Sequence, residues 1–299
     1  MQAVRFSRFG GPEVLELVEL PDPHPGPGEV RIAVRAAGVN ASDWKKRQGL
    51  MDPDLPQTLG YEAAGVVDEL GDGVTDVAVG DRVLGFADGA AQAELAVLLA
   101  YAPIPPSLSF TDVAALPAAV ETAARGLDQL GVTAGTTLLV NGATGNVGSA
   151  AVQLAVARGA RVIGTGGAAG QDRLRAMGAT PVTYGGTMVA QVRAVCPGGV
   201  DRALDVAGSG VLPELVALAG GPEHVVTLAD HAGARQHGVR FSTGESGRAL
   251  DTLHQIGDLV TSGRLALPPV RAFPLAEVAD AHRFGEAGAG HRKIVLVTG

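Results

Sequence analysis

Short runs of alternating or purely apolar residues dominate the first third of the chain. Such runs occupy 30–36, 63–67 and 82–86, and clusters of proline, glycine and aspartate at 21–28 and 71–73 separate them. Proline and glycine at these intervals mark turns, and several short strands at this spacing are typical of a small barrel. We therefore expect residues 1–107 to form a mostly β module.

The pattern changes period from about Thr111. Ser109 or Thr111 can cap a helix that begins at Asp112, and 114–130 is mostly helical with an interruption near Pro117. Strand and helix patterns then alternate. The expected strands are 160–165, 181–184, 200–206 and 224–228, and the expected helices are 172–177, 188–195 and 212–219. This alternation predicts right-handed βαβ units in a parallel, doubly wound sheet.

The end of the chain returns to the first pattern. Residues 248–262 predict an amphipathic helix, and beyond Gly263 there are proline-rich connections, a helix at 276–286 and a last strand at 293–297. We infer that this tail completes the N-terminal module. The predicted domains are therefore 1–107 with 264–299, interrupted by 108–263.

One stretch, 136–155, organises the inserted part. A short apolar strand breaks into a glycine-rich turn and continues as an alanine-rich helix, which is the context that a dinucleotide-binding fingerprint requires. If Ala143 takes the first glycine position, Gly145 lets the backbone approach a pyrophosphate and Gly148 lets the helix pack closely on the strand. The alternative is a plain turn, because the chain has 43 glycines.

Composition and charge narrow the function classes. Hydrophobic residues make up 46% of the chain, aromatic residues 4% and charged residues 18%, so the core is built from small aliphatic side chains. A net charge of −8 gives no general attraction for nucleic acid or an anionic membrane. A single cysteine, Cys196, excludes an intrachain disulfide framework, and 93–102 is too short to span a bilayer. We expect a soluble cytoplasmic protein.

Several motifs along the whole chain resemble the medium-chain dehydrogenase/reductase superfamily, and within it the zinc-free quinone oxidoreductase branch. The motifs are FGGPEVL at 9–15, AAGVNASD at 36–43, LGYEAAGVV at 59–67, VGDRV at 79–83, AALP at 114–117, the turn and helix at 142–155, FPLAE at 273–277 and KIVL at 293–296. The resemblance implies a GroES-like β-barrel catalytic domain with an inserted Rossmann domain, an α/β protein.

The resemblance also bears on whether this chain binds zinc. Zinc-dependent relatives have cysteine at the position of Asn40 and histidine at the position of Tyr61, and their second zinc needs four clustered cysteines. An amide and a phenol are poor zinc ligands, so we expect no metal. Without a Lewis acid, alcohol oxidation is disfavoured. A quinone or a conjugated double bond needs less help, because it delocalises the developing charge itself.

Cofactor choice depends on the end of the second strand of the inserted domain. An NAD enzyme usually has an acidic residue there, whereas this chain has Thr165, Gly166 and Gly167. We therefore expect NADPH, with its 2′-phosphate recognised by Arg173 and Tyr184. An alternative for Arg173 is an ordinary solvated helix residue.

The resemblance implies further cofactor contacts. It places Asn40 near the nicotinamide and substrate, Thr122 on the cofactor, and the backbone around Leu228 and 241–243 at the nicotinamide pocket. Without it, Asn40 is a turn residue, Thr122 a helix position and Phe241 a core aromatic. The full predicted cofactor set is Asn40, Thr122, Ala143, Thr144, Gly145, Asn146, Val147, Gly148, Thr165, Gly166, Gly167, Arg173, Tyr184, Leu228, Phe241, Ser242 and Thr243.

The leading hypothesis is an NADPH-dependent reductase of quinones or enones, with Asn40 and Tyr61 as catalytic candidates and Tyr61 as a hydrogen-bond donor to the reduced oxygen. Two alternatives stay open. One is an enoyl-thioester or polyketide-tailoring reductase with a basic rim at 45–47, and the other is a non-catalytic NADPH-binding protein. The resemblance implies a homodimer paired through nucleotide-domain strands. His231 and His237 are expected to flank a solvated loop.

Overall fold

The computed structural model describes residues 1–244, 247–288 and 292–299. It divides into two compact units, of which unit 1 comprises Met1–Ala118, Leu253–Asp258 and Leu267–Gly299, and unit 2 comprises Ala119–Thr252 and Leu259–Ala266. The α/β class and the insertion of one unit into the other are as the sequence predicts. The predicted domain limits at 107/108 and 263/264 differ from these unit limits and stay a prediction.

Unit 1 is built on strands. They are β1 (Gln2–Phe6), β2 (Glu16–Glu19), β3 (Val30–Val39), β4 (Gln57–Thr58), β5 (Glu62–Leu70), β6 (Arg82–Ala87), β7 (Leu95–Pro103), β14 (Val270–Pro274) and β15 (Lys293–Val297). A small sheet has the order β2-β1-β4, and the main sheet has the order β14-β15-β3-β5-β6-β7. An additional pairing of β3 with β7 closes β3, β5, β6 and β7 into the expected barrel.

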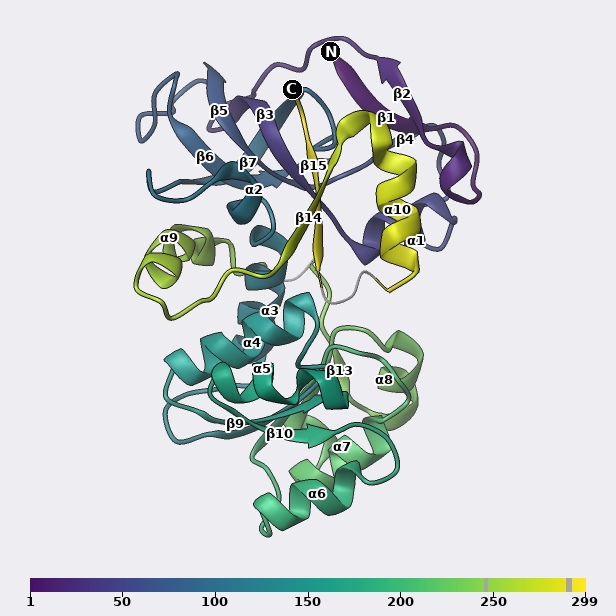
Figure 1. The fold of residues 1–299 in the computed structure, drawn as a ribbon, viewed down its shortest axis with the longest axis vertical. Coiled ribbons are helices and arrows are strands. Elements are labelled where there is room, and N and C mark those ends of the chain that lie inside the picture. Colours follow the sequence, from purple (N-terminus) through teal and green to yellow (C-terminus); the bar gives the residue numbers. More distant parts are fainter. Residues whose placement is uncertain (245–246, 289–291) are drawn as a thin grey trace. The chain divides into compact units, whose positions relative to one another are not determined.

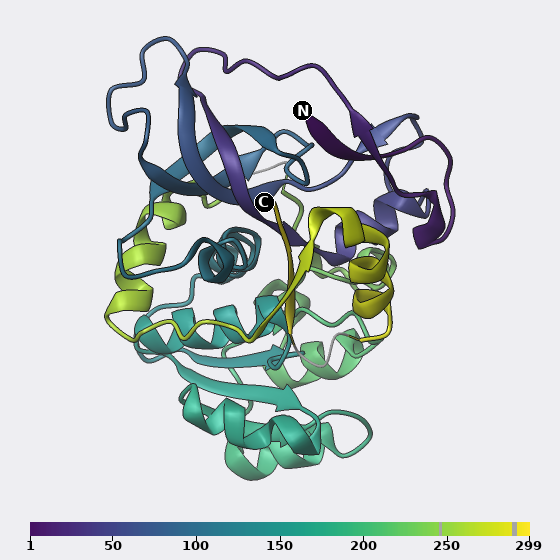
Figure 2. The ribbon, with the colours of Figure 1, turned by 45° about the horizontal axis from the view of Figure 1, so that its top comes forward.

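Alternation along β3 explains how the barrel acquires its core. Val30, Ile32 and Val34 are buried while the residues between them are less so, which is the period-two pattern of a strand with one face on a core. Beyond Ala36 both faces of β3 are buried. Over this part of β3 the neighbouring strand is β15, which runs antiparallel to it with Val39 opposite Ile294. The tail of the chain therefore completes the sheet that begins near its start (Figure 2).

Unit 2 contains a six-stranded parallel sheet of order β10-β9-β8-β11-β12-β13. The strands are β8 (Thr137–Asn141), β9 (Arg161–Gly166), β10 (Ala179–Thr183), β11 (Arg202–Asp205), β12 (Val225–Thr227) and β13 (Arg240–Phe241). Helices α4 and α5 cover one face and α6 and α7 the other (Figure 1). This confirms the predicted doubly wound sheet.

The helices of the two units follow. They are α1 (Ala41–Arg47), α2 (Phe110–Val113), α3 (Pro117–Gln129), α4 (Asn146–Ala157), α5 (Gln171–Ala176), α6 (Met188–Val195), α7 (Leu212–Ala219), α8 (His231–His237), α9 (Leu253–Thr261) and α10 (Val278–Glu286). Short 3₁₀ turns are η1 (Pro12–Val14), η2 (Ala168–Gly170), η3 (Pro222–His224), η4 (Leu250–Thr252) and η5 (Leu275–Glu277).

Two expectations about local structure were wrong. The segment from His231 to His237 is helix α8 and not a loop, because Asp230 accepts a hydrogen bond from the Gly233 N–H (2.7 Å) as N-cap, and Gly238 ends the helix in a left-handed conformation (φ +67°). The helix expected over 248–262 starts later. It begins as the 3₁₀ turn η4 and becomes α-helical at Leu253.

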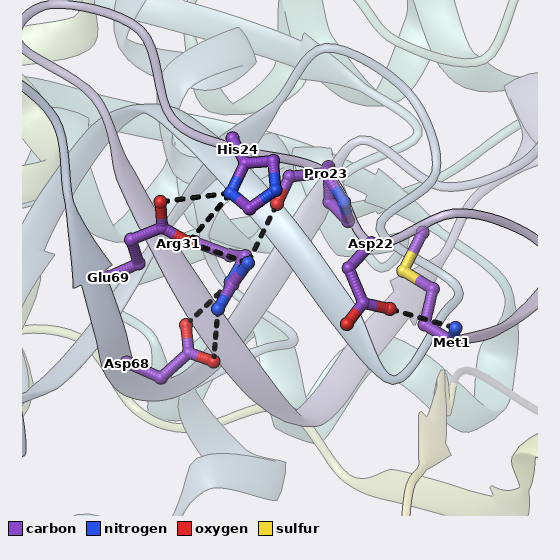
Figure 3. Close-up of polar contacts among 7 residues, drawn as sticks. All are labelled: Met1, Asp22, Pro23, His24, Arg31, Asp68 and Glu69. Carbon is purple, nitrogen blue, oxygen red and sulfur yellow. Dashed lines mark hydrogen bonds and ion pairs between the residues drawn. The ribbon is translucent and has the colours of Figure 1, made fainter.

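A surface network fastens the proline-rich segment 20–28 to the barrel (Figure 3). Arg31 on β3 binds Asp68 (Nε to Oδ1, 3.0 Å) and Glu69 of β5, and donates to the Pro23 carbonyl. The Glu69 carboxylate also makes a hydrogen bond with the ring of His24, whose side chain is largely exposed. Within the described ranges, no helix is long and apolar enough to cross a membrane.

Candidate functional site

The strand order of unit 2 defines where a ligand binds. The chain runs from β8 to β9 and β10 on one side, and then crosses to β11, β12 and β13 on the other. In open parallel sheets, ligands bind outside the carboxyl ends of the strands at this switch point, here between β8 and β11. Each side of the switch point then serves one half of a dinucleotide.

The glycine-rich turn lies directly after β8. Gly142 has φ +82°, a left-handed conformation that favours glycine. Its N–H donates to the Thr165 hydroxyl (2.9 Å), and the Ala143 N–H donates to the Thr165 carbonyl (3.0 Å). Thr165, predicted as a cofactor contact, therefore also holds the turn against the end of β9.

Gly145 and Gly148 are glycines for different reasons. A Cβ on Gly148 would lie 2.1 Å from the Gly142 carbonyl oxygen, so the start of α4 packs directly on the turn. A Cβ on Gly145 would meet only the same oxygen at 3.5 Å, and its φ of −73° is ordinary. The described chain does not itself require glycine at 145. The position is the N-cap of α4, where the free N–H groups of Asn146, Val147 and Gly148 attract an anion.

A buried polar network runs along the carboxyl ends of four strands. Asn141 ends β8, accepts from the Thr165 hydroxyl (2.9 Å) and donates to Asp205 at the end of β11 (2.9 Å). Asp205 also accepts from the Thr227 hydroxyl on β12 (2.8 Å) and from the N–H groups of Ala207 and Gly208. The four side chains are almost completely buried. The network thus crosses the switch point and fixes the edge on which a ligand would lie.

The region after β9 has an unpaired cation. Arg173 on α5 is half-buried, and burial lowers the pKa of its guanidinium. Within the described part of the chain Arg173 has no ion pair or hydrogen bond, whereas its neighbour Arg175 binds Asp172 (2.7 Å). The exposed Tyr184 side chain lies against Gly167, with its hydroxyl oxygen 3.4 Å and its nearest ring carbon 3.5 Å from the position of a Cβ there.

Thr144 belongs to the same region. Its methyl group lies 2.7 Å and 2.6 Å from where a Cβ would stand on Gly166 and Gly170. The glycines after β9 therefore allow the turn after β8 to approach them. Of the predicted adenosine-half residues, the structure brings together those of the 143–148 turn and those of 165–167.

The predicted nicotinamide-half residues lie at the ends of β12 and β13. Leu228 and Phe241 are half-buried, and the Phe241 ring meets His231 edge-on at 5.1 Å. The Ser242 hydroxyl is bonded to Arg125 of α3 and is buried. Thr122 on α3 is half-buried and donates to Glu121 (3.3 Å). The Ser242 and Thr122 hydroxyls are thus engaged within unit 2.

In unit 1, Asn40 stands at the end of β3 beside a buried ion pair. Lys293 of β15 and Glu62 of β5 are fully buried and 2.6 Å apart. Asn40 accepts from Lys293 (2.5 Å) and donates to Glu62 (2.7 Å), so both ends of its amide are used. The second Glu62 oxygen accepts from the Ala118 N–H (2.7 Å). Glu62 therefore has a structural hydrogen-bonding role.

The buried side chain of Asp43 caps the N-terminus of helix α1. One carboxylate oxygen accepts from the Asn40 N–H (2.7 Å) and the other from the Gly60 N–H (3.2 Å). Burial raises the pKa of the Asp43 carboxyl to about 6, against the opposing effect of these two hydrogen bonds. Asp43 thus orients Asn40 from its backbone, while Lys293 and Glu62 orient its side chain.

Tyr61 follows the Leu59–Gly60 turn, and its side chain meets Ser42 and Phe86. The Ser42 hydroxyl donates to the Tyr61 oxygen (3.3 Å), and the Tyr61 ring lies parallel to Phe86 at 6.4 Å between centroids. Tyr61 is half-buried. A phenol held in this way by a second hydroxyl is able to donate a proton to a developing oxyanion.

The residues at the zinc-ligand positions do not fit zinc. Asn40 has its oxygen on an ammonium and its nitrogen on a carboxylate, and Tyr61 supplies a phenol. Across 1–244, 247–288 and 292–299, there is no group of three histidine, cysteine, aspartate or glutamate residues that could hold a metal ion.

Sequence reasoning missed several residues of these clusters. Asn141, Asp205 and Thr227 each end a parallel strand with a polar side chain after an apolar run, and this shared position is a signal that could have been used. Lys293 was assigned only to a strand and to a family motif. A lysine opening an otherwise apolar strand, KIVLV, is the corresponding signal for a buried ion pair.

Known protein families and solved structures match parts of both units. Residues 26–99 match the profile of the alcohol dehydrogenase GroES-like domain, and residues 177–296 match the zinc-binding dehydrogenase profile. The solved quinone oxidoreductase of Coxiella burnetii is 30% identical, with a TM-score of 0.86 over 99% of both chains. A structure described as an NAD-dependent alcohol dehydrogenase is 32% identical, with a TM-score of 0.85 over 100% of both chains.

These similarities cover the whole chain, and the chain belongs to the medium-chain dehydrogenase/reductase superfamily. Its fold is that of oxidoreductases that bind a nicotinamide cofactor. A further relative is the spectinabilin polyketide synthase system protein NorB of Streptomyces orinoci, which is 34% identical over 98% of this chain. The chain spans only 14% of that protein's length.

Proposed function

We propose that this protein is a zinc-independent, NADPH-dependent reductase that transfers a hydride to a quinone or an enone-type double bond. The observation that carries the proposal is the open glycine at 145. It lies at the start of α4, where nothing in the described chain needs a glycine but a pyrophosphate approaching the backbone would.

The preference for NADPH is supported by Arg173. Among the described residues its half-buried guanidinium has no carboxylate partner, and an anion joining it would offset the desolvation that lowers its pKa. The 2′-phosphate of NADPH is such an anion, and the neighbouring Thr165–Gly167 segment has no acidic side chain that would repel it. Tyr184 beside Gly167 supplies a flat apolar face, with a hydroxyl for the adenosine end.

Unit 1 supplies the groups for the acceptor. When bound, the reduced dinucleotide supplies the hydride. Tyr61 donates a proton or hydrogen bond to the oxygen of the acceptor, and Ser42 holds the phenol in place. The Asn40 side chain is a polar group in a fixed orientation, since its amide is held by Lys293 and Glu62. Because the acceptor must spread the new charge over its own conjugated system, quinones and enones suit this site better than simple ketones.

The test is a turnover assay on the purified protein, with a panel of quinones, enones and saturated ketones. The absorbance of the reduced nicotinamide is followed with NADPH and, in parallel, with NADH. We expect turnover of the conjugated acceptors only, and faster turnover with NADPH. An Arg173→Met variant should lose the preference for NADPH while keeping activity with NADH. Equal activity of the wild type with both cofactors would overturn the cofactor assignment.

A second candidate, an enoyl-thioester reductase, is favoured by the polyketide synthase relative that aligns with 98% of this chain. The predicted basic rim is smaller than expected, because Arg47 is fully buried and bound to Glu286 (2.5 Å). Only Lys45 and Lys46 stay available. If a carrier-linked enoyl thioester is the substrate, a Lys45→Ala, Lys46→Ala double variant should raise its KM without changing turnover of a small enone.

The third candidate is a protein that binds NADPH without catalysis. It predicts that NADPH raises the unfolding temperature while every acceptor in the panel stays unreduced. The predicted homodimer is a separate question, and sedimentation velocity at two protein concentrations would answer it.

A further inference from the structure

A buried ion pair on α3 reaches the segment that follows β13. Arg125 donates from Nε to Glu121, one helical turn earlier (2.9 Å). Its Nη1 donates to the Ser242 hydroxyl and to the Thr243 carbonyl (3.1 Å). Glu121 in turn accepts from the Ala249 N–H (3.1 Å). One ion pair therefore binds side-chain and backbone groups of a segment more than a hundred residues away in sequence.

Close packing of α3 explains why this pair is buried. Gly126, the next residue on the helix, lies so near β11 that a Cβ would stand 2.9 Å from Leu204, and Leu228 is its next neighbour at 3.8 Å. Glu121 and Arg125 are almost fully buried as a result. Burying two charges is costly unless their hydrogen-bonding groups are satisfied, and here Ser242, Thr243 and Ala249 supply partners for them.

The position of the segment suggests what the pair is for. β12 and β13 lie on the far side of the switch point from β9 and β10, so their carboxyl ends serve the second half of a dinucleotide. The Ser242 N–H is fixed by the Thr227 carbonyl (3.0 Å), and the side chain and the next carbonyl are fixed by Arg125. Nothing else from the described residues holds the Thr243 carbonyl.

We infer that Glu121 and Arg125 are positioning residues that hold Phe241–Gly244 in the shape required by the nicotinamide half of the cofactor. The inference rests on the proposed function. Neither side chain needs to touch the cofactor, because Arg125 acts through Ser242 and Thr243. The adenosine half, on the other side of the switch point, has no connection to the pair and should be insensitive to it.

The experiment uses a Glu121→Gln, Arg125→Met double variant, since Arg125→Met alone would leave a buried carboxylate without its cation. The control is Arg158→Met, which removes another arginine bound to a carboxylate of α3, Asp128 (2.8 Å), but one with no hydrogen bond or ion pair to the described residues of 241–249. Two ligands are titrated against each protein: NADPH, and 2′,5′-ADP, which contains only the adenosine half. Backbone hydrogen exchange of 239–244 is measured without ligand.

For the double variant we expect NADPH affinity to fall about tenfold or more, which corresponds to about 1.4 kcal/mol, and exchange over 239–244 to accelerate. Affinity for 2′,5′-ADP should stay the same, as should both affinities in Arg158→Met. Arg125→Lys, which keeps the positive charge and a single donor nitrogen, should retain part of the NADPH affinity that the double variant loses.

One set of results would overturn the positioning role, and another would overturn the proposed function. If the wild type binds both ligands and the double variant binds NADPH equally tightly, or if both ligands weaken together, the positioning role is wrong. If the wild type binds neither ligand, the proposed function itself fails.

Discussion

The two units each contain a buried polar cluster, and the clusters are built on different principles. In unit 1, Lys293 and Glu62 oppose one another as full charges, with Asn40 between them. In unit 2, Asp205 is a single charge surrounded by four donors from Asn141, Thr227 and two backbone N–H groups. The first cluster depends on one partner, and the second divides its stabilisation among many.

This difference has a consequence for function. A cluster held by one ion pair fixes one side chain firmly, as Asn40 is fixed at the end of β3. A cluster held by many neutral donors fixes a whole edge, as the ends of β9, β8, β11 and β12 are fixed in unit 2. A reacting group needs the first kind of support, and a long ligand lying across several strands needs the second.

The largest expected effect is on the unit 1 cluster. Lys293→Met leaves Glu62 buried without its cation, and we expect the free energy of unfolding to fall by about 3–5 kcal/mol. Adding Glu62→Gln to this variant should restore most of the loss. Denaturant unfolding measures both. If the single and double variants are equally unstable, the ion pair is not what the cluster depends on.

The unit 2 cluster should respond less. Asp205→Asn keeps one acceptor oxygen and the side-chain volume but removes the charge and presents an amide to one donor, so we expect a loss of about 1–3 kcal/mol. The same unfolding measurement checks it. A loss larger than that of Lys293→Met would reverse the comparison between the two clusters.

The pH dependence of stability tests two buried titratable groups of unit 1, Asp43 and His282. The Asp43 pKa is raised to about 6 by burial, so between pH 4 and 6 the folded state binds more protons than the unfolded state and Asp43 favours stability at the lower pH. Burial lowers the pKa of His282 to about 3, helped by Arg47, so over the same range the unfolded state binds more protons and His282 favours the higher pH.

Single substitutions should separate these opposing effects. Relative to the wild type, the stability of His282→Leu should rise as the pH falls from about 6 to 4, and that of Asp43→Asn should fall, each by at most about 1.4 kcal/mol per pH unit. Unfolding curves across this range show the slopes. If both variants have the same slope, at least one of the two groups lacks its assigned pKa shift.

The smallest expected effect on stability is at Gly145. Because the described chain leaves room for a side chain there, Gly145→Val should cost only the weaker capping of α4 by valine, about 1 kcal/mol of unfolding free energy or less, yet abolish NADPH binding. Gly148→Ala is the matched contrast, since its Cβ would meet the Gly142 carbonyl and destabilise the fold. A folded Gly145→Val protein that binds NADPH normally would show that the pyrophosphate lies elsewhere.

Much of the fold follows from the sequence, because periodicity reports burial directly. Helices α6 and α7 and strand β15 have the predicted limits, and Ser109 caps α2 as expected by accepting from the Asp112 N–H. Helix α8 was missed because its sequence, HAGARQH, has almost no apolar stripe. Its start and end depend on Asp230 and Gly238, which are local signals and not periodic ones.

The site was less predictable than the fold. The glycine turn has a local signature, but the partners of Asn40 lie 22 and 253 residues away and carry no motif that links them. The same holds for Arg125 and Ser242, which meet only when α3 packs on β11. Polar pairs of this kind are set by topology, so a single sequence names the participants only after the sheet order is known.

The pairing of β3 with β15 also bears on how the chain is made. Asn40 and Lys293 are 253 residues apart, and the residues of unit 2 are synthesised between them. Unit 2 can therefore fold during translation, since domains fold as units when their residues are available. In unit 1, residues 36–39 of β3 instead lack their partner strand on one edge until β15 is made, although residues 30–33 can already pair with β7. A ribosome stalled before residue 293 should carry a protease-resistant nucleotide-binding unit joined to a barrel sheet that lacks β15.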